Sequence, residues 1–366
     1  MMILNRTVVV VIGLFLIPRF CFLQNLSKSI KPVNVILMIA DGVGISQISG
    51  GLYQNEKELF IEKMPYVGLQ KTNSLNSLNT DPAAAATAMA CGVKSFDGGL
   101  GISMDSVSVP SMLELGAKKK MKTGIITTAS MTHETVAAFW AHTAHSREEE
   151  SIALQMLQAP LDLIIGGGEK FYRERKDNYN LISTLINKGF MVVSVPSDTQ
   201  TFPKADLSKN YVAFTAFDFP STVLEGRNYL PTAATFALDF LKKKDQEKHG
   251  FFLIINSAQT AWGAKKNNPA YMLSEYEDFN QTIGKVLSFA EKDKETLVIV
   301  TSGYELGGYA INPGSKPGNL QHEFTGKSVT GTLVPVFSYG PGAANFTGFY
   351  ENTDFLPKLK ALFGWD

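Results

Sequence analysis

The sequence predicts a single α/β domain: a three-layer α/β/α sandwich built on a large, mostly parallel central sheet. Short apolar runs alternate with amphipathic runs along the chain, which is the pattern of strands and crossover helices. The apolar runs lack a period of two, as is typical of strands covered by helices on both faces. With 45% hydrophobic and 19% charged residues over 366 positions, the composition is globular rather than disordered.

Runs rich in Val, Ile, Leu and Phe are the predicted strands, at residues 35–39, 122–127, 161–165, 191–195, 251–255, 296–301 and 332–338. The predicted helices are residues 46–53, 83–91, 109–119, 148–158, 181–188, 232–243, 271–292 and 354–363. Two stretches rich in polar residues, Gly or Pro, 196–210 and 307–318, are predicted loops. Neither has the character of a domain linker, so we expect one domain.

The first 24 residues have the features of an export signal. Arg6 precedes an apolar run at 8–17, and Pro18 and Arg19 close it. The run is short for a membrane span. We therefore expect a signal peptide over residues 1–24, with an uncleaved N-terminal anchor as the alternative and as the one predicted contact with a membrane. Either implies an exported protein, whether periplasmic, secreted or associated with the cell envelope.

Charge and cysteine content exclude some classes of function. The formal net charge is zero, so no basic face for a nucleic acid is expected. Cys21 lies within the predicted signal, which leaves Cys91 without an intrachain disulfide partner. Cys91 lies in an Ala- and Met-rich helical run and is expected to be a small buried apolar residue.

Three polar residues lie where predicted strands end. Asp41, Asn256 and Ser302 follow the strands at 35–39, 251–255 and 296–301. Ligands of open α/β sheets bind outside the carboxyl ends of their strands. The sequence therefore predicts a functional site at this edge of the sheet.

Several motifs resemble the alkaline phosphatase family, from about residue 33 to the C-terminus at residue 366. They are VILMIADGVG at 35–44, TDPAAAATAMACGVK at 80–94, IIGGGEKF at 164–171 and VPVFSYGPGA at 334–343. The resemblance implies one alkaline phosphatase-like domain over residues 33–366. It also implies the family's site, in which two zinc ions and one magnesium surround a serine nucleophile and an arginine holds the phosphate.

Four site positions match the family. Asp41 matches the aspartate that bridges zinc and magnesium, and His133 and Thr135 match the magnesium-side pair. Arg147 matches the phosphate-binding arginine, whose planar fork fits two phosphate oxygens. The resemblance thus implies a residual, weak magnesium site at the first three residues. The alternatives are that His133 and Thr135 are polar groups satisfied near the core, and that Arg147 pairs with the glutamates at 148–150.

Seven matched positions depart from the family. Pro82 occupies the position of the serine nucleophile and has no hydroxyl, so no catalytic residue is predicted. Asn256 replaces the magnesium-side glutamate. The zinc-ligand positions hold Ala261, Lys265, Gly303, Tyr304 and Val329. Too few ligands are left for zinc, so zinc is not expected and at most one magnesium is.

The replacements have simple structural interpretations. Asp81 can cap the helix that starts next to it, and Pro82 suits the first helical position, where its missing N–H is harmless. Lys265 is expected to pair with Asp41, supplying the positive charge that zinc would have supplied. The alternative is that Lys265 points to solvent with Lys266.

The leading hypothesis is a pseudoenzyme: an alkaline phosphatase-like protein without turnover that retains binding of phosphate or another small anion. One alternative is a weak metal-dependent phosphomonoester hydrolase, in which Thr80 or Thr87 serves as nucleophile. Another is a scaffold of the cell envelope, which would bind no ligand.

Overall fold

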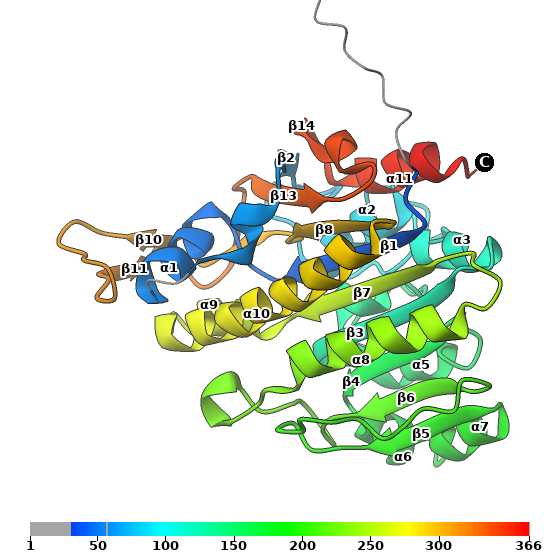
Figure 1. The fold of residues 1–366 in the computed structure, drawn as a ribbon. Coiled ribbons are helices and arrows are strands. Elements are labelled where there is room, and N and C mark those ends of the chain that lie inside the picture. The colour runs from blue at the N-terminus through cyan, green and yellow to red at the C-terminus, as the bar shows by residue number, and fades with distance from the viewer. Residues whose placement is uncertain (1–30, 56–57, 366) are drawn as a thin grey trace, which may run out of the picture.

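The computed structural model describes residues 31–55 and 58–365. Their main feature is one ten-stranded sheet with the order β14-β2-β13-β8-β1-β7-β3-β4-β6-β5, accompanied by the two-stranded sheets β10-β11 and β12-β9 (Figure 1). The strands are β1 (Asn34–Ala40), β2 (Tyr66–Lys71), β3 (Lys122–Ser130), β4 (Leu163–Gly167), β5 (Phe190–Ser194), β6 (Asn210–Phe214), β7 (Phe251–Ser257), β8 (Thr296–Thr301), β9 (Glu305–Leu306), β10 (Tyr309–Ile311), β11 (His322–Phe324), β12 (Val329–Thr330), β13 (Val334–Tyr339) and β14 (Gly348–Glu351).

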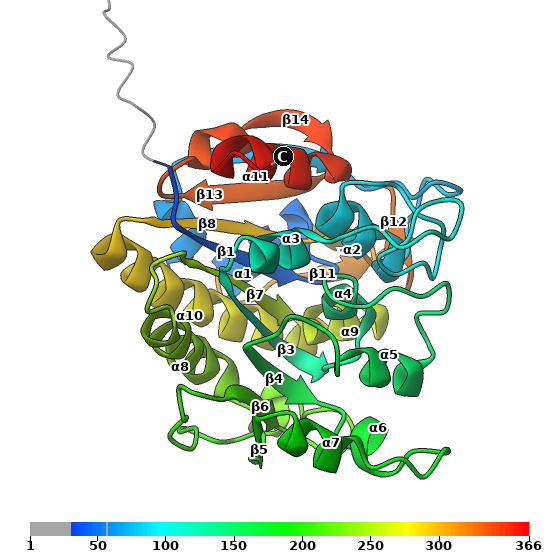
Figure 2. The same cartoon turned by 90° about the vertical axis from the view of Figure 1, so that its right-hand side faces the viewer.

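The helices are α1 (Ile45–Asn55), α2 (Pro82–Cys91), α3 (Met112–Lys118), α4 (Glu134–Ala137), α5 (Glu149–Gln155), α6 (Lys170–Arg173), α7 (Leu181–Asn187), α8 (Tyr229–Lys244), α9 (Gln259–Lys265), α10 (Pro269–Asp293) and α11 (Phe355–Phe363). They cover both faces of the sheet (Figure 2). In the large sheet β13 runs antiparallel to β2 and β8, and the other described pairings are parallel. The predicted three-layer α/β/α fold is confirmed.

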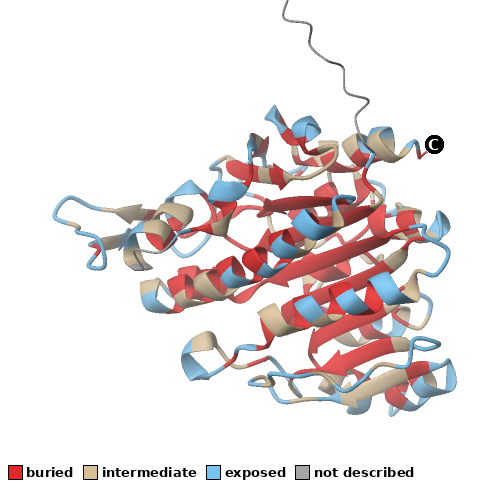
Figure 3. Cartoon of the chain, viewed as in Figure 1, coloured by how far each residue is buried: buried red, intermediate tan, exposed pale blue. Residues whose placement is uncertain are grey.

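The central strand β1 shows why its sequence is apolar at consecutive positions. Val35, Leu37 and Ile39 pack into a core shared with α2, α3 and α11. The alternate residues of β1 pack into a second core with α8 and α10 on the other face. Both faces of the strand are therefore buried, and Figure 3 shows the central strands buried along their length while the helices are banded.

The sequence missed part of the architecture. The strands β2, β6 and β14 of the large sheet were not predicted, nor were the short helices α4, α6 and α9. Strands β2 and β14 lie at one edge and are partly exposed, so they lack the long apolar runs of the centre. The prediction of a loop over 307–318 was wrong in part, because β10 lies within it.

The predicted export signal at 1–24 and Cys21 fall outside the described residues. Within the described part of the chain, no helix combines the length and apolar character needed to cross a membrane. Cys91 is buried and has no disulfide, as predicted.

Candidate functional site

The carboxyl ends of three adjacent strands meet where the sequence predicted a site. Asp41 directly follows β1, Asn256 lies near the end of β7, and Ser302 follows β8. The strand register places Ile39 beside both Asn256 and Thr301, so the three polar residues lie at one edge. The candidate site is here the region around Asp41 at this edge.

Asp41 is fully buried at the centre of the candidate site. The Thr135 hydroxyl donates to its Oδ2 over 2.8 Å, and no described residue bonds its Oδ1. Burial raises the pKa of Asp41 to about 6, against the opposing effects of His133, Thr135 and Asn256. The carboxylate thus keeps one oxygen without a hydrogen bond in a dry environment.

His133 lies beside Asp41 at the start of α4. Its imidazole is buried, with Nε2 3.8 Å from the Glu134 carboxylate and the ring 6.1 Å from that of Trp262. Its Nδ1 has no hydrogen-bond partner among the described residues. Thr135 is hydrogen-bonded to Asp41, whereas His133 Nδ1 is not bonded by a described residue, and the magnesium-side role of this pair stays a prediction.

Pro82 is the first residue of α2. Asp81 precedes it in an extended conformation and accepts hydrogen bonds from Ala84 N at its Oδ1 and from Gly98 N at its Oδ2, both over 2.7 Å. The predicted cap and the predicted first-turn proline are confirmed. The first position of α2 is therefore a pyrrolidine ring without a hydroxyl.

The two nearby threonines are engaged elsewhere. Thr87 is buried within α2, where its hydroxyl donates to Gly99 O over 2.8 Å and accepts from Gly101 N over 3.0 Å. Thr80 is also buried, and its hydroxyl donates to Asp81 O over 3.1 Å. Neither hydroxyl replaces the missing nucleophile without breaking these bonds.

An apolar cluster includes three of the positions that the sequence resemblance matched to zinc ligands: Ala261, Tyr304 and Val329. Ala261, Tyr304 and Leu306 are buried members of it, and Val329 packs against them. The packing is close, because a Cβ on Gly42 would lie 3.0 Å from Leu306 Cβ and 3.1 Å from Ala261 Cβ. These side chains supply no imidazole or carboxylate for zinc.

Tyr304 replaces a ligand with a group that stays neutral. Burial, with smaller effects of Asp41, Glu134 and Asp81, raises the pKa of its phenol well above the usual value. Across residues 31–55 and 58–365, no three or more His, Cys, Asp or Glu side chains are grouped so that they could hold a metal ion. The donor set present does not fit zinc.

The predicted pairing of Lys265 with Asp41 is wrong. Lys265 is the exposed last residue of α9 and forms no ion pair with the buried Asp41. An ammonium group reaches water there at no desolvation cost, whereas the inward position of α9 is taken by Ala261. The alternative, a Lys265 directed to solvent, is the one observed.

Lys265 instead lines a pocket of about 310 Å³ next to the nucleophile position. Asp81, Pro82 and Lys327 line the same pocket. Sequence reasoning missed Lys327. The available signal was a lysine two residues before Val329, within a segment already matched to the family.

Arg147 is exposed in the loop between α4 and α5. Its neighbour Ser146 donates through its backbone N to Gly98 O over 3.1 Å, and Gly98 in turn binds Asp81, so the loop is held beside the start of α2. The guanidinium forms no hydrogen bond or ion pair with any residue that the structure describes.

The alternative of a surface ion pair for Arg147 is therefore wrong. Glu149 turns inward instead, where it accepts hydrogen bonds from the hydroxyls of Thr132 and Ser130. Glu150 accepts from the backbone N of Lys176 over 3.1 Å.

Comparison with known proteins decides the family. The model of the alkaline phosphatase family matches residues 32–325. The chain belongs to the alkaline phosphatase family. Alkaline phosphatase 3 of Bacillus subtilis is 31% identical over 76% of this chain and 62% of its own length, so the chain spans less than two thirds of that relative. The alkaline phosphatase of Escherichia coli is 26% identical over 92% of this chain and 88% of its own.

Solved structures of alkaline phosphatases share the fold. The enzyme of the Antarctic bacterium TAB5 has a TM-score of 0.85 and 35% identity, covering 92% of this chain and 99% of its own. A variant of that enzyme was solved with magnesium bound. The Thermus thermophilus enzyme, at 18% identity and a TM-score of 0.83, covers 96% of both chains and supports the fold alone.

Proposed function

We propose that this chain is an exported alkaline phosphatase-like pseudoenzyme that does not turn over phosphomonoesters and binds phosphate or another small anion. One observation carries the loss of activity: the nucleophile position is a proline at the first turn of α2. The hydroxyls of Thr80 and Thr87 are buried and hydrogen-bonded to backbone groups. A phosphoryl group would meet no activated oxygen there.

The loss of zinc supports the same proposal. In two-metal phosphoryl transfer, the metals activate the attacking oxygen and stabilise the leaving one. Here Ala261, Tyr304 and Val329 pack together where the family has zinc ligands. An apolar core at these positions would leave the reaction without the Lewis acids that it needs.

A small anion suits the groups that remain. Lys265 and Lys327 line the pocket beside Pro82, and neither forms an ion pair with a described residue. Arg147 is held nearby with a free guanidinium, which can grip two oxygens of one phosphate. Asp81 lines the pocket too, but both its oxygens accept backbone N–H groups.

One weak magnesium ion at Asp41, His133 and Thr135 completes the proposal. Asp41 Oδ1 is buried without a partner, and hard cations favour carboxylate oxygen. Asn256 offers only a neutral oxygen, and it already accepts a hydrogen bond from the Thr127 hydroxyl over 2.8 Å. One carboxylate accounts for weak binding.

The last part of the proposal is that the protein is exported. It is supported by Arg6 and the apolar run at 8–17 in the sequence. Western analysis of cell fractions tests it, with a chain lacking residues 1–24 as the control that should stay in the cytoplasm.

Calorimetry with inorganic phosphate tests anion binding. Arg147→Ala and Lys327→Ala should each weaken phosphate binding by about tenfold, the usual effect of one lost charge-assisted hydrogen bond. Lys188→Ala removes an exposed lysine at the end of α7, away from the pocket lining, and should leave the affinity unchanged. Equal phosphate binding by all four proteins would show that Arg147 and Lys327 do not hold the anion, and no binding by the natural chain would favour the scaffold.

A further inference from the structure

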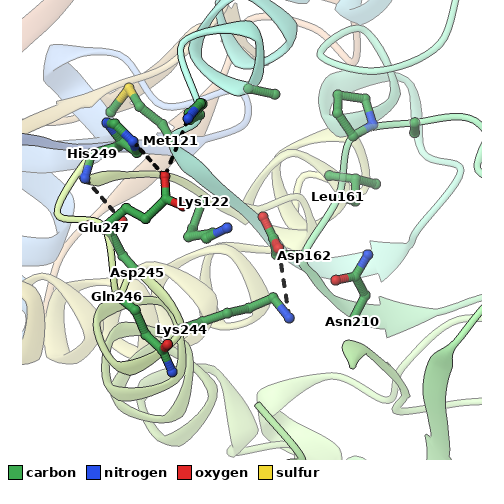
Figure 4. A pocket seen from close by; sticks show the side chains of 14 residues that line it. Met121, Lys122, Leu161, Asp162, Asn210, Lys244, Asp245, Gln246, Glu247 and His249 are labelled. Carbon is green, nitrogen blue, oxygen red and sulfur yellow. Dashed lines mark hydrogen bonds and ion pairs between the residues drawn. The ribbon is translucent and has the colours of Figure 1, made fainter. Parts of the chain in front are cut away.

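A second pocket, with a volume of about 590 Å³, lies at the amino ends of the parallel strands, opposite the candidate site (Figure 4). Lys122 begins β3, Asn210 begins β6, and Asp162 directly precedes β4. These strands are parallel, so their amino ends share this edge, away from the carboxyl ends that carry the candidate site. The ends of α3 and α8 flank the pocket.

Most charged groups in this pocket are already paired. Lys244 donates to Leu207 O over 3.0 Å and to Lys209 O over 2.8 Å, and its Nζ lies 3.9 Å from Asp162 Oδ1. Burial lowers the pKa of Lys244. The ammonium of Lys244 is thus committed to the protein.

The acidic residues near the rim are also satisfied. Glu247 accepts from Lys120 over 3.4 Å and binds the His249 ring over 2.9 Å (Figure 4). Asp245 accepts the backbone N–H groups of His249 and Gly250. Because these carboxylates already have partners, the pocket does not need a cation to neutralise them.

Lys122 differs from its neighbours. Its side chain makes no hydrogen bond or ion pair with any described residue. It lies close enough to Asp162 to oppose the rise in the pKa of that carboxyl, which is caused by burial. Asp162 Oδ2 accepts from Thr123 N over 3.0 Å. The amide of Asn210 likewise has no side-chain hydrogen bond in the described structure.

Helix capping explains some of the lysines here but not Lys122. The lysines at 118–120 and 242–244 lie at the ends of α3 and α8, where positive charge favours the helix dipole. Lys122 is at the start of a strand and gains nothing from a dipole.

We propose that this pocket binds a small oxyanion, a carboxylate or phosphate group, with the Lys122 ammonium as its main donor and the Asn210 amide as its second. An oxyanion would supply acceptors for both groups at once. The proposal is independent of the candidate site, because the two pockets share no lining residue.

Calorimetry on the purified full-length chain at low salt tests it, with citrate and inorganic phosphate as probes in an Arg147→Ala background. Lys122→Gln should weaken the binding of a probe by about tenfold. Lys119→Gln, which removes an equal charge from an exposed lysine outside the pocket lining, should leave it unchanged. Asp162→Asn should tighten binding, because it removes the negative charge next to Lys122.

Three results would overturn the proposal: no heat with either probe, unchanged binding in Lys122→Gln, or equal weakening in Lys119→Gln. The last would mean that diffuse surface charge attracts the anions. Binding of citrate but not phosphate, or the reverse, identifies which oxyanion the pocket takes. Failure here leaves the Arg147 and Lys327 test of the proposed function untouched, since that test concerns the other pocket.

Discussion

Asp41, at the scale of one residue, is the buried carboxyl that our proposal assigns to a weak magnesium site. The carboxyl is buried, with a pKa raised to about 6 from 3.8. A raised carboxyl pKa means that the folded state binds the proton more tightly than the unfolded chain. The contribution of Asp41 to the free energy of unfolding is therefore greatest below about pH 4, and it is lost as the pH rises to about 6.

Asp41→Asn removes this titration. Relative to the natural chain, the variant should gain about 2 kcal/mol in free energy of unfolding between pH 4 and pH 7.5, which is most of the shift of about two pKa units expressed as energy. Urea unfolding of both proteins at the two pH values measures it. If the two proteins differ in free energy of unfolding by the same amount at both pH values, the pKa of Asp41 is not raised in the folded state.

Pro82 leads to a second prediction. Restoring the hydroxyl with Pro82→Ser should leave phosphatase activity at background, because the matched positions Ala261, Tyr304 and Val329 still offer no zinc ligand. Stability should change by less than about 1 kcal/mol, the usual effect of a proline at a compatible position. Hydrolysis of an aryl phosphate and thermal unfolding are the measurements. A clear gain of zinc-dependent activity would show that metal binding had survived.

The sequence predicted residue roles that depend on local structure, but not those that depend on tertiary packing. The cap by Asp81 and the placement of Pro82 depend on local rules, and both were predicted. The direction of Lys265 depends on how α9 packs on β9, so matching to a family position could not give it. Arg147 has no ion pair because Glu149 and Glu150 are bonded by other segments of the chain, which the sequence alone does not show.

At the scale of elements, residues of α9, β9 and β12 pack together in an apolar cluster. Leu306 of β9 is 7% exposed within it. Leu306→Ala should lower the free energy of unfolding by about 2–5 kcal/mol, as cavities in packed cores do. Leu78→Ala is the matched control, since Leu78 is 82% exposed and should cost little. Similar losses in both variants would argue against a packed cluster.

The elements also show where sequence patterns fail. The central strands were predicted because both their faces are apolar, as β1 illustrates. Strand β6 was missed because its five residues follow a polar, Pro-containing loop, and β14 because three of its four residues are exposed or partly so. Helix α9 has only seven residues, too few for a clear helical period.

At the scale of the whole molecule, the two pockets lie at opposite ends of the parallel strands, and zinc is expected in neither pocket. Elemental analysis of protein dialysed after exposure to zinc should find none bound, because the ligand positions pack as a core. Magnesium should bind weakly and be lost in Asp41→Asn. Retention of about two zinc ions per chain would contradict this.

Hydrolysis of an aryl phosphate by the purified chain, with zinc and magnesium supplied, tests the pseudoenzyme proposal most directly. Loss of a nucleophile can cost on the order of 10⁶ in kcat. We predict a rate indistinguishable from that of a blank purified in the same way. Turnover above about 1 s⁻¹, an ordinary enzyme rate, that co-purifies with the chain would contradict the proposal.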